Sequence, residues 1–445
     1  MKRFNLFSFI FLISLGGLIS VCVEAQLFTE TFFIDKEFDF SGREKILASL
    51  FHISQEAYFY LEKDWFENLT SEEKGKIISS LKNLTQEFDQ IIYPQLTSLF
   101  GSEWRPGIDN NERITILFHQ LKENNMGYFN NGDEFPRLQN PKSNEREMIY
   151  LNANSLFSEK VKSFLAHEFV HLITFNQKDR IRNQSEEVWL NELRADYGIT
   201  YLGYNDEYQD SILQHRVNIF LENSSDSLIE WKDQIKDYGV INLFGHYLVE
   251  HYGKEILVDS LFSKEVGLAS LEYALEKNKI NKKISEIFTD WLIALLLNNC
   301  SLGETYCYKN PYLQNLRIIS SLIFVPSSQK TNLSLNYSLK PWSGQWYRII
   351  GTKGDLRLEF KGVKDGFFRI AYVLCRNGSQ DCQIDYLKLD SNQEGKIIIR
   401  NFSENYNTLT FIPLIFNKEE KFFDFSLLIS IENFKEEEKE KLLKI

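Results

Sequence analysis

The sequence predicts an α+β protein: a largely helical part with a small sheet, followed by an antiparallel β-sandwich of the jelly-roll kind. From Ser41 to about Cys307, apolar residues recur mostly at helical spacing, with a few strand-like runs inserted. After Tyr308 the chain changes to about eight short segments, often alternating and rich in β-branched and aromatic residues. At 445 residues it is long enough for two or three domains.

The first 25 residues have the pattern of a secretory signal peptide. Lys2 and Arg3 precede a long apolar run, and small or aliphatic residues end at Ala25. We expect residues 1–25 to be removed and the protein to be secreted, periplasmic or on the cell surface. An uncleaved anchor is the alternative, since the apolar run is nearly long enough to span a bilayer. No membrane span is expected after signal removal.

The helical part contains one long segment before its strands and several after them. The segment SEEKGKIISSLKNLTQEFDQIIYPQLTSLFG predicts a helix from a cap at Ser71 to Gly101. Helical periodicity returns at Ser158 and continues to about Asn299. The apolar WLIALLLNNC in this region is too short to cross a bilayer and fits a buried helix.

Two strand-like runs, RITILF (113–118) and EMIYLN (147–152), flank a loop rich in Gly, Asn and Pro that contains GYF (127–129). Before the first run lies GIDNNER (107–113), whose side-chain oxygens could hold calcium. We interpret it as a polar turn, because it lacks the full spacing of a calcium loop.

The sandwich is predicted from eight segments. They are TNLSLNYSL, WYRIIG, DLRLEF, FFRIAYVL, CQIDYLKL, GKIIIR, TLTFIPLIF and FFDFSLLISI. Clusters such as TKGD and SNQEG separate them as turns. These patterns predict a first domain over 26–310, a β-sandwich over 311–435 and a charged tail over 436–445.

Cysteine usage agrees with export. Cys22 leaves with the signal, and the remaining four form the pairs Cys300 with Cys307 and Cys375 with Cys382, each separated by six residues. A local disulfide loop closes over such a spacing in an oxidising compartment. Zinc binding by four thiolates is the alternative, but this spacing is wider than in structural zinc sites.

Composition excludes one class of partner. The formal net charge is −12, with acidic and basic residues interspersed and no basic stripe. Such a surface repels nucleic acid, so no nucleic-acid partner is expected.

The stretch FLAHEFVHLITFNQ (164–177) carries the strongest chemical signal. His167 and His171 lie one helical turn apart, which lets two imidazoles share a metal ion. Glu168 can reach a metal-bound water without being a ligand. The helix is apolar on nearly all sides and should be buried. Burying the two imidazoles and the Glu168 carboxylate costs free energy unless a partner binds them. A zinc ion supplies that partner. The alternative is an ordinary pair of core histidines.

A second segment, SEEVWLNELRADYG (185–198), completes the set. It predicts a helix capped by Ser185. Glu192 follows His171 with twenty residues between, enough for a loop and a returning helix, and is the predicted third zinc ligand. Asp196 lies on the same face and is predicted to accept the free N–H of His167. Solvent-facing charges on a surface helix are the alternative.

HEFVH followed by WLNELRAD resembles the gluzincin metallopeptidases, whose pattern is H-E-x-x-H, some twenty residues, then N-E with an Asp four after the Glu. Thr174 and Gln177 stand where metzincins need Gly and a third His. The exopeptidase motif G-x-M-E-N of gluzincin aminopeptidases is absent from the chain. Between 91 and 253 the stretches PGIDNNERITILF, GYFNNGDEF and YGVINLFGHYLVEHYG are also similar to the hyicolysin family of bacterial secreted neutral proteases.

This resemblance implies a zincin-like catalytic domain and a secreted zinc endopeptidase acting on protein or peptide substrates. Glu168 would be the general base, and a downstream Tyr or His would stabilise the oxyanion. Tyr238 is the first candidate for that role and His246 the second. Substrate is expected along an edge strand near GYF. Such families often have Gly after the ligand Glu, where this chain has Leu193.

The alternative function is a catalytically weak or inactive surface-binding protein that retains the zincin fold. Glu168 argues against it, because a purely structural zinc site does not need that base. A zinc hydrolase acting on something other than protein is a third possibility. The partner of the sandwich, the cleavage specificity and the oligomeric state are not set by any motif.

Overall fold

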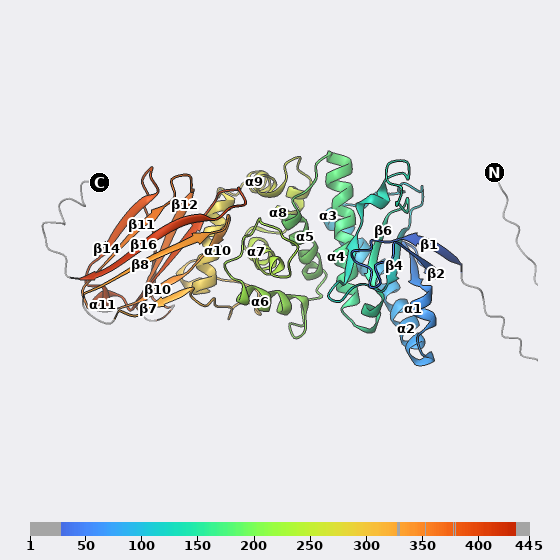
Figure 1. The fold of residues 1–445 in the computed structure, drawn as a ribbon, viewed down its shortest axis with the longest axis horizontal. Coiled ribbons are helices and arrows are strands. Elements are labelled where there is room, and N and C mark those ends of the chain that lie inside the picture. The colour runs from blue at the N-terminus through green and yellow to red at the C-terminus, as the bar shows by residue number, and fades with distance from the viewer. Residues whose placement is uncertain (1–27, 327–329, 352, 377, 379, 433–445) are drawn as a thin grey trace, which may run out of the picture.

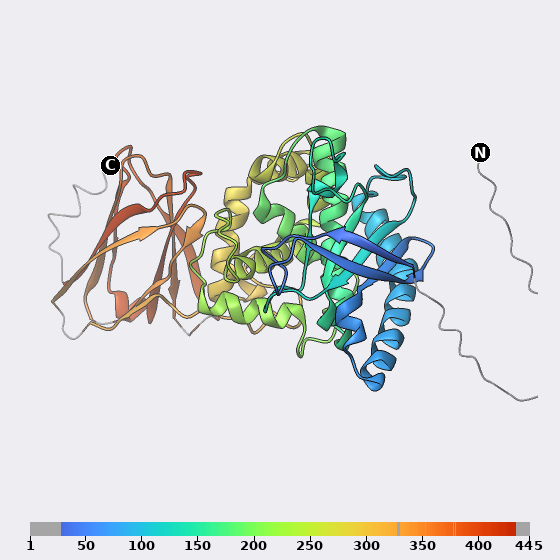
Figure 2. The same ribbon diagram turned by 45° about the vertical axis from the view of Figure 1, so that its right-hand side comes forward.

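The computed structural model describes residues 28–326, 330–351, 353–376, 378 and 380–432. The molecule is elongated, with a β-sheet part at one end, helices in the middle and a β-sandwich at the other end (Figure 1). A turned view shows the same order of parts (Figure 2). The predicted α+β class is therefore confirmed. The predicted signal peptide (1–25) and charged tail (436–445) lie outside the described residues.

The first sheet has six strands in the order β1-β2-β3-β4-β6-β5. Neighbours β3, β4 and β6 run parallel, whereas β1, β2 and β5 join antiparallel. The strands are β1 (Thr29–Phe33), β2 (Lys45–Ile53), β3 (Ala57–Glu62), β4 (Ile114–His119), β5 (Gly127–Phe129) and β6 (Met148–Asn152). Strand β5 pairs only with β6, so it forms an edge of the sheet.

Strands β4 and β6 confirm the two predicted runs. Strands β1 to β3 were not expected, and the prediction of a mainly helical pattern from Ser41 is wrong up to Glu62. The first half of β2, KILA, alternates between exposed and buried positions. That period of two is the signal that could have identified the strand.

The long predicted helical segment shares an apolar core with β3, β4 and β6 and is divided into α2 (Ser71–Glu87), η1 (Phe88–Ile92) and α3 (Tyr93–Phe100). The cap is Thr70, one residue before the predicted Ser71. Its hydroxyl accepts from the Glu73 N–H, and the Glu73 carboxylate accepts from the Thr70 N–H in return. The segment ends at Gly101, whose φ of +82° favours glycine. The short α1 (Lys63–Glu67) joins β3 to α2.

The central part is helical, as predicted. Its helices are α4 (Val161–Thr174), η4 (Phe175–Arg180), α5 (Val188–Tyr201), α6 (Ile212–Glu222), α7 (Asp237–Tyr252), α8 (Glu255–Leu261), α9 (Gly267–Lys277) and α10 (Ile284–Leu297), with short 3₁₀ turns η2 (Asn131–Glu134), η3 (Ala153–Phe157) and η5 (Cys300–Leu302). Helix α4 packs against β5 and β6 on one side and α5 on the other. Helix α10 is buried along its length, as predicted for WLIALLLNNC. Within the described ranges, no helix has the length and apolar character needed to cross a bilayer.

The C-terminal part is a sandwich of two sheets, with strand orders β13-β12-β15-β10-β7 and β14-β11-β16-β8. All eight predicted segments form strands, and all their pairings are antiparallel except that between β10 and β7. The strands are β7 (Leu322–Phe324), β8 (Thr331–Leu339), β9 (Ser343–Gly344), β10 (Tyr347–Ile350), β11 (Asp355–Gly362), β12 (Phe368–Cys375), β13 (Cys382–Leu387), β14 (Glu394–Ile399), β15 (Thr408–Ile415) and β16 (Phe423–Glu432), with a short helix α11 (Phe402–Asn405).

The sandwich packs directly on the helical part through α10. The Trp346 indole N–H donates to the Leu292 carbonyl (3.1 Å), and the rings of Trp342 and Phe288 are 5.5 Å apart. Buried residues of β12 and β15 belong to the same apolar core as α10. The two parts therefore share a continuous core across their junction.

Both predicted disulfides are confirmed. Cys300 is bonded to Cys307 just after α10, and Cys375 to Cys382 across the β12–β13 hairpin. The second pair occupies directly opposed positions on the two strands, so the bond closes that hairpin.

Candidate metal centre

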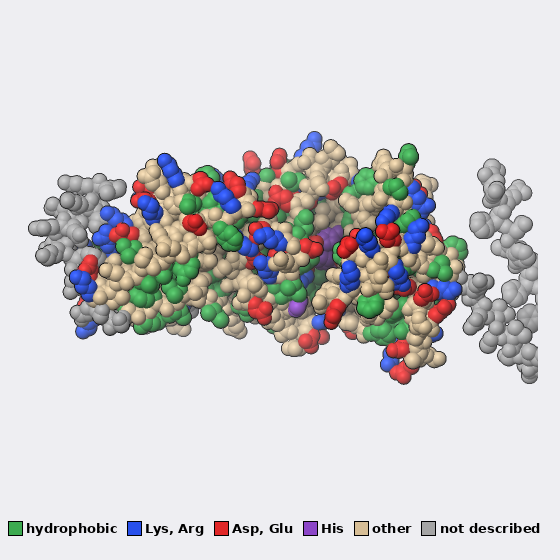
Figure 3. Space-filling view, in the orientation of Figure 1, with side chains coloured by type: hydrophobic (Ala, Val, Ile, Leu, Met, Phe, Trp, Pro, Cys, Tyr) green, Lys and Arg blue, Asp and Glu red, His purple; other side chains and the backbone are tan. Residues whose placement is uncertain are grey.

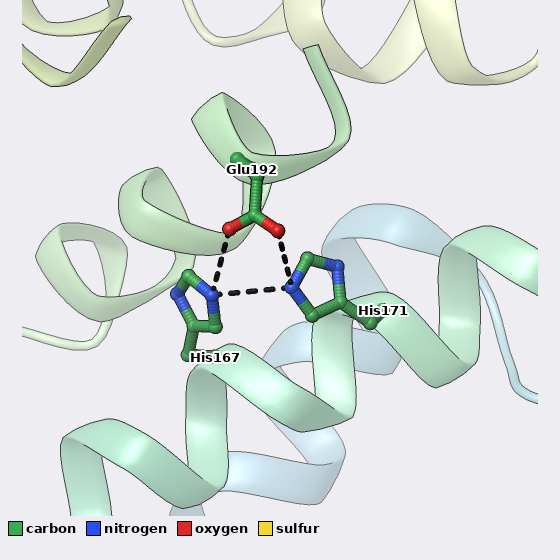
Figure 4. A group of neighbouring side chains, drawn as sticks. All are labelled: His167, His171 and Glu192. Atoms are coloured by element: carbon green, nitrogen blue, oxygen red, sulfur yellow. Dashed lines mark hydrogen bonds and ion pairs between the residues drawn. The ribbon is translucent and has the colours of Figure 1, made fainter. Parts of the chain in front are cut away.

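Helix α4 carries the two histidines of the HEFVH motif. Its sequence is apolar on nearly all sides because it is enclosed by the sheet and by α5. His167 and His171 project from consecutive turns on the same face, toward α5 (Figure 4). The side chain of His167 is 12% exposed and that of His171 is 9% exposed, so both are largely buried.

Helix α5 supplies Glu192 opposite the two histidines. The helix begins at Val188 with Glu187 as its N-cap residue. The predicted cap, Ser185, is wrong: its hydroxyl donates to Asp179 (3.1 Å) in the preceding connection. A buried ion pair between Arg194 and Glu186 (2.7 Å) instead fixes the start of α5.

The three side chains form a compact triangle (Figure 4). The Nε2 atom of His167 is 3.1 Å from Nε2 of His171 and 3.1 Å from a Glu192 oxygen. The other Glu192 oxygen is 3.5 Å from Nε2 of His171. With ligand distances of 2.0–2.1 Å, two ligands of a tetrahedral zinc ion lie about 3.3 Å apart. The triangle therefore matches one face of a zinc coordination tetrahedron.

No other group of three or more His, Cys, Asp or Glu ligand atoms within 4.8 Å occurs in the described part of the chain. Two imidazole nitrogens and a carboxylate lie within hydrogen-bond distance of one another in a largely buried site, and a shared cation would offset the cost of burying them there. The donor set of two nitrogens and one carboxylate is one that zinc accepts while keeping a fourth position open.

The charges of the site are strongly coupled. Burial alone lowers the pKa of His167, but the hydrogen bonds that its imidazole donates to the Asp196 and Glu192 carboxylates outweigh burial and raise the pKa to about 10. Burial likewise opposes the shift of His171, whose pKa is raised by Glu192. In Glu192 the two imidazoles overcome the effect of burial and hold the pKa well below its usual range. The carboxylate is therefore ionised and ready to bind a cation.

Asp196 lies behind His167. One of its oxygens is 3.3 Å from Nδ1 of His167, so the carboxylate accepts the Nδ1–H and directs Nε2 toward the triangle. Its side chain is fully buried. Asn242 also donates to it (3.2 Å).

Arg216 on α6 is a residue that the sequence did not reveal. Its guanidinium forms two bonds with Asp196, at 2.9 and 3.1 Å, and lies 4.1 Å from the centre of the Tyr238 ring. Burial raises the pKa of Asp196, but Arg216 and His167 reverse this and lower the pKa to about 2. The sequence held no usable signal, because Arg216 is one cation within an ordinary amphipathic helix.

Glu168 faces an open cleft of about 740 Å³ that is also lined by His167, Arg216 and Tyr238. Histidine side chains are visible on this face of the molecule, between the sheet part and the central helices (Figure 3). Burial raises the pKa of Glu168 above its usual value, against the charges of the two histidines. Edge strand β5 passes very close: a Cβ on Gly127 would lie 2.8 Å from Oε1 of Glu168.

The two candidates for oxyanion stabilisation lie in different places. Tyr238, at the start of α7, lines the cleft beside His167 and Glu168. His246, two turns further along α7, lines a separate cavity and lies 3.3 Å from the Thr200 hydroxyl. Burial lowers the pKa of His246 to about 4, so its imidazole is neutral.

Leu193, for which the resemblance in sequence led us to expect a glycine, is buried against α7. A Cβ added to Gly245 would meet two of its side-chain carbons at 3.1 Å. The small residue on α7 thus makes room for the larger one on α5.

No family model matches the sequence. The chain is 30% identical to the neutral metalloprotease ShpI of Staphylococcus hyicus over 244 residues, which cover 48% of this chain and 52% of that protein. The chain is related to a metallopeptidase. It spans about half the length of this relative.

Among solved structures, the periplasmic lysozyme inhibitor PliG of Aeromonas hydrophila is 10% identical, matches 26% of this chain and all of its own, and has a TM-score of 0.19. A structure of carbohydrate-binding modules of the β-sandwich superfamily is 8% identical, over 24% of this chain and 55% of its own, with a TM-score of 0.15. Similarity at TM-scores of 0.19 and 0.15 does not indicate a shared fold or function.

Proposed function

We propose that the protein is a secreted zinc-dependent endopeptidase of the gluzincin type, similar to the hyicolysins, in which residues 26–310 form the catalytic domain. The observation that carries the proposal is the triangle of His167, His171 and Glu192 with Glu168 beside it in an open cleft. A purely structural zinc site needs neither the open cleft nor an acid next to the ligands. Relationship to a metalloprotease supports the same activity.

The zinc ligands would be His167 and His171 through Nε2 and Glu192 through its carboxylate. When bound there, zinc polarises the substrate carbonyl and lowers the pKa of a water molecule to about 7. Asp196 keeps the Nδ1–H of His167 in place, which fixes the tautomer that presents Nε2.

Glu168 is the proposed general base. Its carboxylate accepts a proton from the attacking water and passes it to the leaving nitrogen. The raised pKa from burial makes the protonated form accessible, which suits a group that must both accept and release a proton. Tyr238 is the proposed oxyanion donor through its hydroxyl, since it shares the cleft with Glu168 whereas His246 does not.

The substrate backbone would pair with edge strand β5. This strand has a partner on one side only, and Gly127 brings its main chain against Glu168. An extended peptide adding to β5 would therefore present its carbonyl next to the base. The two disulfides fit an oxidising compartment and so support export.

Metal analysis combined with casein digestion tests this proposal. Wild type and Glu168→Gln should each hold about one zinc per chain, but Glu168→Gln should lose proteolysis by at least 100-fold, in the range for loss of a general base. Glu192→Ala should lose both zinc and activity. Glu159→Gln, an exposed glutamate before α4, is the matched control and should behave as wild type.

Equal digestion by Glu168→Gln would refute the assignment of the base. A zinc-loaded wild type that leaves unfolded casein intact would instead favour a surface-binding protein or a hydrolase with a non-protein substrate.

A further inference from the structure

The segment that connects α6 to α7 (residues 223–236) contacts both the C-terminal sandwich and the cleft. It forms no helix or strand. Residues 233–235 and Tyr238, which follows at the start of α7, line the cleft together with Glu168. Residues 226–230 are mostly buried although they have no regular structure. Contacts outside the segment must therefore fix its path.

The sandwich binds this connecting segment through the loop between β8 and β9 (residues 340–342). The Leu228 N–H donates to the Trp342 carbonyl (3.0 Å), and the Ser227 hydroxyl donates to the Pro341 carbonyl. Ser227 and Leu228 are 1% and 0% exposed. Trp342 is also buried and has a φ of +51°, which bulky residues rarely adopt, so its contacts fix the shape of the loop.

Lys340 of the same loop joins two buried acids of the connecting segment. Its ammonium lies 2.6 Å from Asp226 and 2.8 Å from Glu230, whose side chains are 5% and 7% exposed. Burial lowers the pKa of Lys340, but its hydrogen bonds to both carboxylates outweigh burial and raise the pKa. Lys232 and Lys236 also pair with these acids, but their side chains are 46% and 31% exposed, so solvent screens those pairs more strongly. The least exposed cation at these acids therefore comes from the sandwich.

The rest of the connecting segment is tied to Tyr238. The rings of Trp231 and Tyr238 pack edge to face, with 4.9 Å between their centres and 77° between their planes. The Asp237 carboxylate accepts from the backbone N–H groups of Lys232 and Gln234, both at 2.9 Å. These bonds close a turn directly before Tyr238. The position of the Tyr238 ring in the cleft therefore depends on the path of the segment.

We propose that Lys340, in the C-terminal sandwich, is a positioning residue that keeps the Tyr238 hydroxyl where it can donate to the oxyanion. It acts through the connecting segment, which it binds at Asp226 and Glu230 and which contacts Tyr238 through Trp231. The inference rests on the proposed peptidase activity with Tyr238 as the oxyanion donor. Such a donor must be accurately placed, since a misplacement of about 1 Å can cost roughly 100-fold in rate.

Kinetics of Lys340→Met test the positioning role. The substrate is a casein peptide that the wild type cleaves, and zinc is held saturating. Lys340→Met should lower kcat at least tenfold with KM within twofold and about one zinc per chain, because a misplaced donor weakens only the transition state. Lys340→Arg should keep at least half of the wild-type kcat, since a guanidinium can bond to both carboxylates.

A double-variant cycle with Tyr238→Phe separates positioning from general stability. Without the hydroxyl there is no donor to misplace, so adding Lys340→Met to Tyr238→Phe should change kcat less than twofold. A merely structural contact would lower kcat by the same factor in both backgrounds.

Arg369→Met is the matched control at another contact between the sandwich and the helices. Arg369 of β12 donates to the Ser285 carbonyl and the Thr289 hydroxyl of α10, both at 3.1 Å. Its loss should lower the melting temperature but leave kcat within twofold of wild type.

Amide hydrogen exchange tests the connecting segment without using peptidase activity. In the Glu168→Gln protein, adding Lys340→Met should speed the exchange of amides 226–232 at least tenfold and leave α4 and α5 unchanged. Asp226→Asn removes one of the two carboxylates at nearly constant shape and should give the same pattern. It replaces Lys340→Met if that variant loses the near-ultraviolet circular dichroism of the parent.

Three results would each overturn the proposal: a normal kcat in Lys340→Met, an equal loss of kcat in the Tyr238→Phe background, or unchanged exchange of the segment. A wild type that cleaves no peptide would instead reject the peptidase and with it the role of Tyr238. Amide exchange would then still show whether the sandwich holds the segment.

Discussion

Replacing Asp196 by asparagine should separate the orientation of a zinc ligand from the stability of the fold. The carboxylate accepts from His167 at 3.3 Å and pairs with Arg216 at 2.9 Å. Two unit charges 3.3 Å apart attract by about 5 kcal/mol at an effective dielectric of 20. The N–H of a zinc-bound imidazole carries only part of a charge, so we expect 10- to 100-fold weaker zinc binding, or about 1.4–2.7 kcal/mol.

The same change leaves Arg216 without its buried partner. Breaking such a pair costs about 3–5 kcal/mol of folding free energy. The double variant Asp196→Asn/Arg216→Met removes the unpaired cation, so it should regain at least half of the lost stability. It should not regain zinc affinity, because His167 still lacks its carboxylate.

Zinc affinity is measured by competition with a chromophoric chelator, and stability by urea unfolding with zinc saturating. Asp290→Asn is the control: this buried acid lies on the distant α10 and pairs with Lys282, so its loss should lower stability but not zinc affinity. Zinc affinity within twofold of wild type in Asp196→Asn would refute the orienting role. A double variant no more stable than the single one would refute the cost assigned to Arg216.

Two further results follow from the geometry. Gly127→Ala should lower kcat at least tenfold with zinc content unchanged, because the added methyl group would lie 2.8 Å from the Glu168 carboxylate. Gly75→Ala is the control, because a methyl group there would have nothing within 4 Å. A normal kcat in Gly127→Ala would contradict the close approach of β5 to Glu168. Zinc binding at pH 7 should release at least one proton, since metal-free His167 has a pKa raised to about 10 and must lose its proton to bind. The affinity for zinc should therefore fall as the pH falls. Calorimetry in buffers of different ionisation enthalpy should give the number of protons released. A binding enthalpy that does not depend on the buffer would contradict the coupling of zinc binding to proton release.

Much of the fold was predictable from local pattern. All eight segments of the sandwich were identified because alternation and β-branched residues persist along each strand, and α10 because its apolar run is continuous. Strands β1 to β3 were missed because their alternation is short: in β2 it extends only over KILA, before the register shift between Leu50 and His52. The caps of α2 and α5 were misplaced because several neighbouring residues can cap a helix: at α2 the local pair Thr70 and Glu73 forms the cap, and at α5 Ser185 bonds to Asp179 instead.

The candidate zinc ligands were predictable because helix geometry converts a spacing of four residues into a shared face. His167, His171 and the partner pair Glu192 and Asp196 all follow from that rule. Arg216 was not predictable, because it meets Asp196 only through the packing of α6 against the other helices. The choice between Tyr238 and His246 was open for the same reason, since both lie on α7 and only the position of the cleft distinguishes them.

The sequence by itself determined which residues share a helix face, which segments become strands in the sandwich and which cysteines can pair, because these depend on spacing along the chain. The tertiary structure alone decided how α5 faces α4, that Gly127 touches Glu168, and that Arg216 pairs with Asp196. Those contacts join residues far apart in sequence, and no local period records them. They depend on packing, which brings distant groups to distances of a few ångströms.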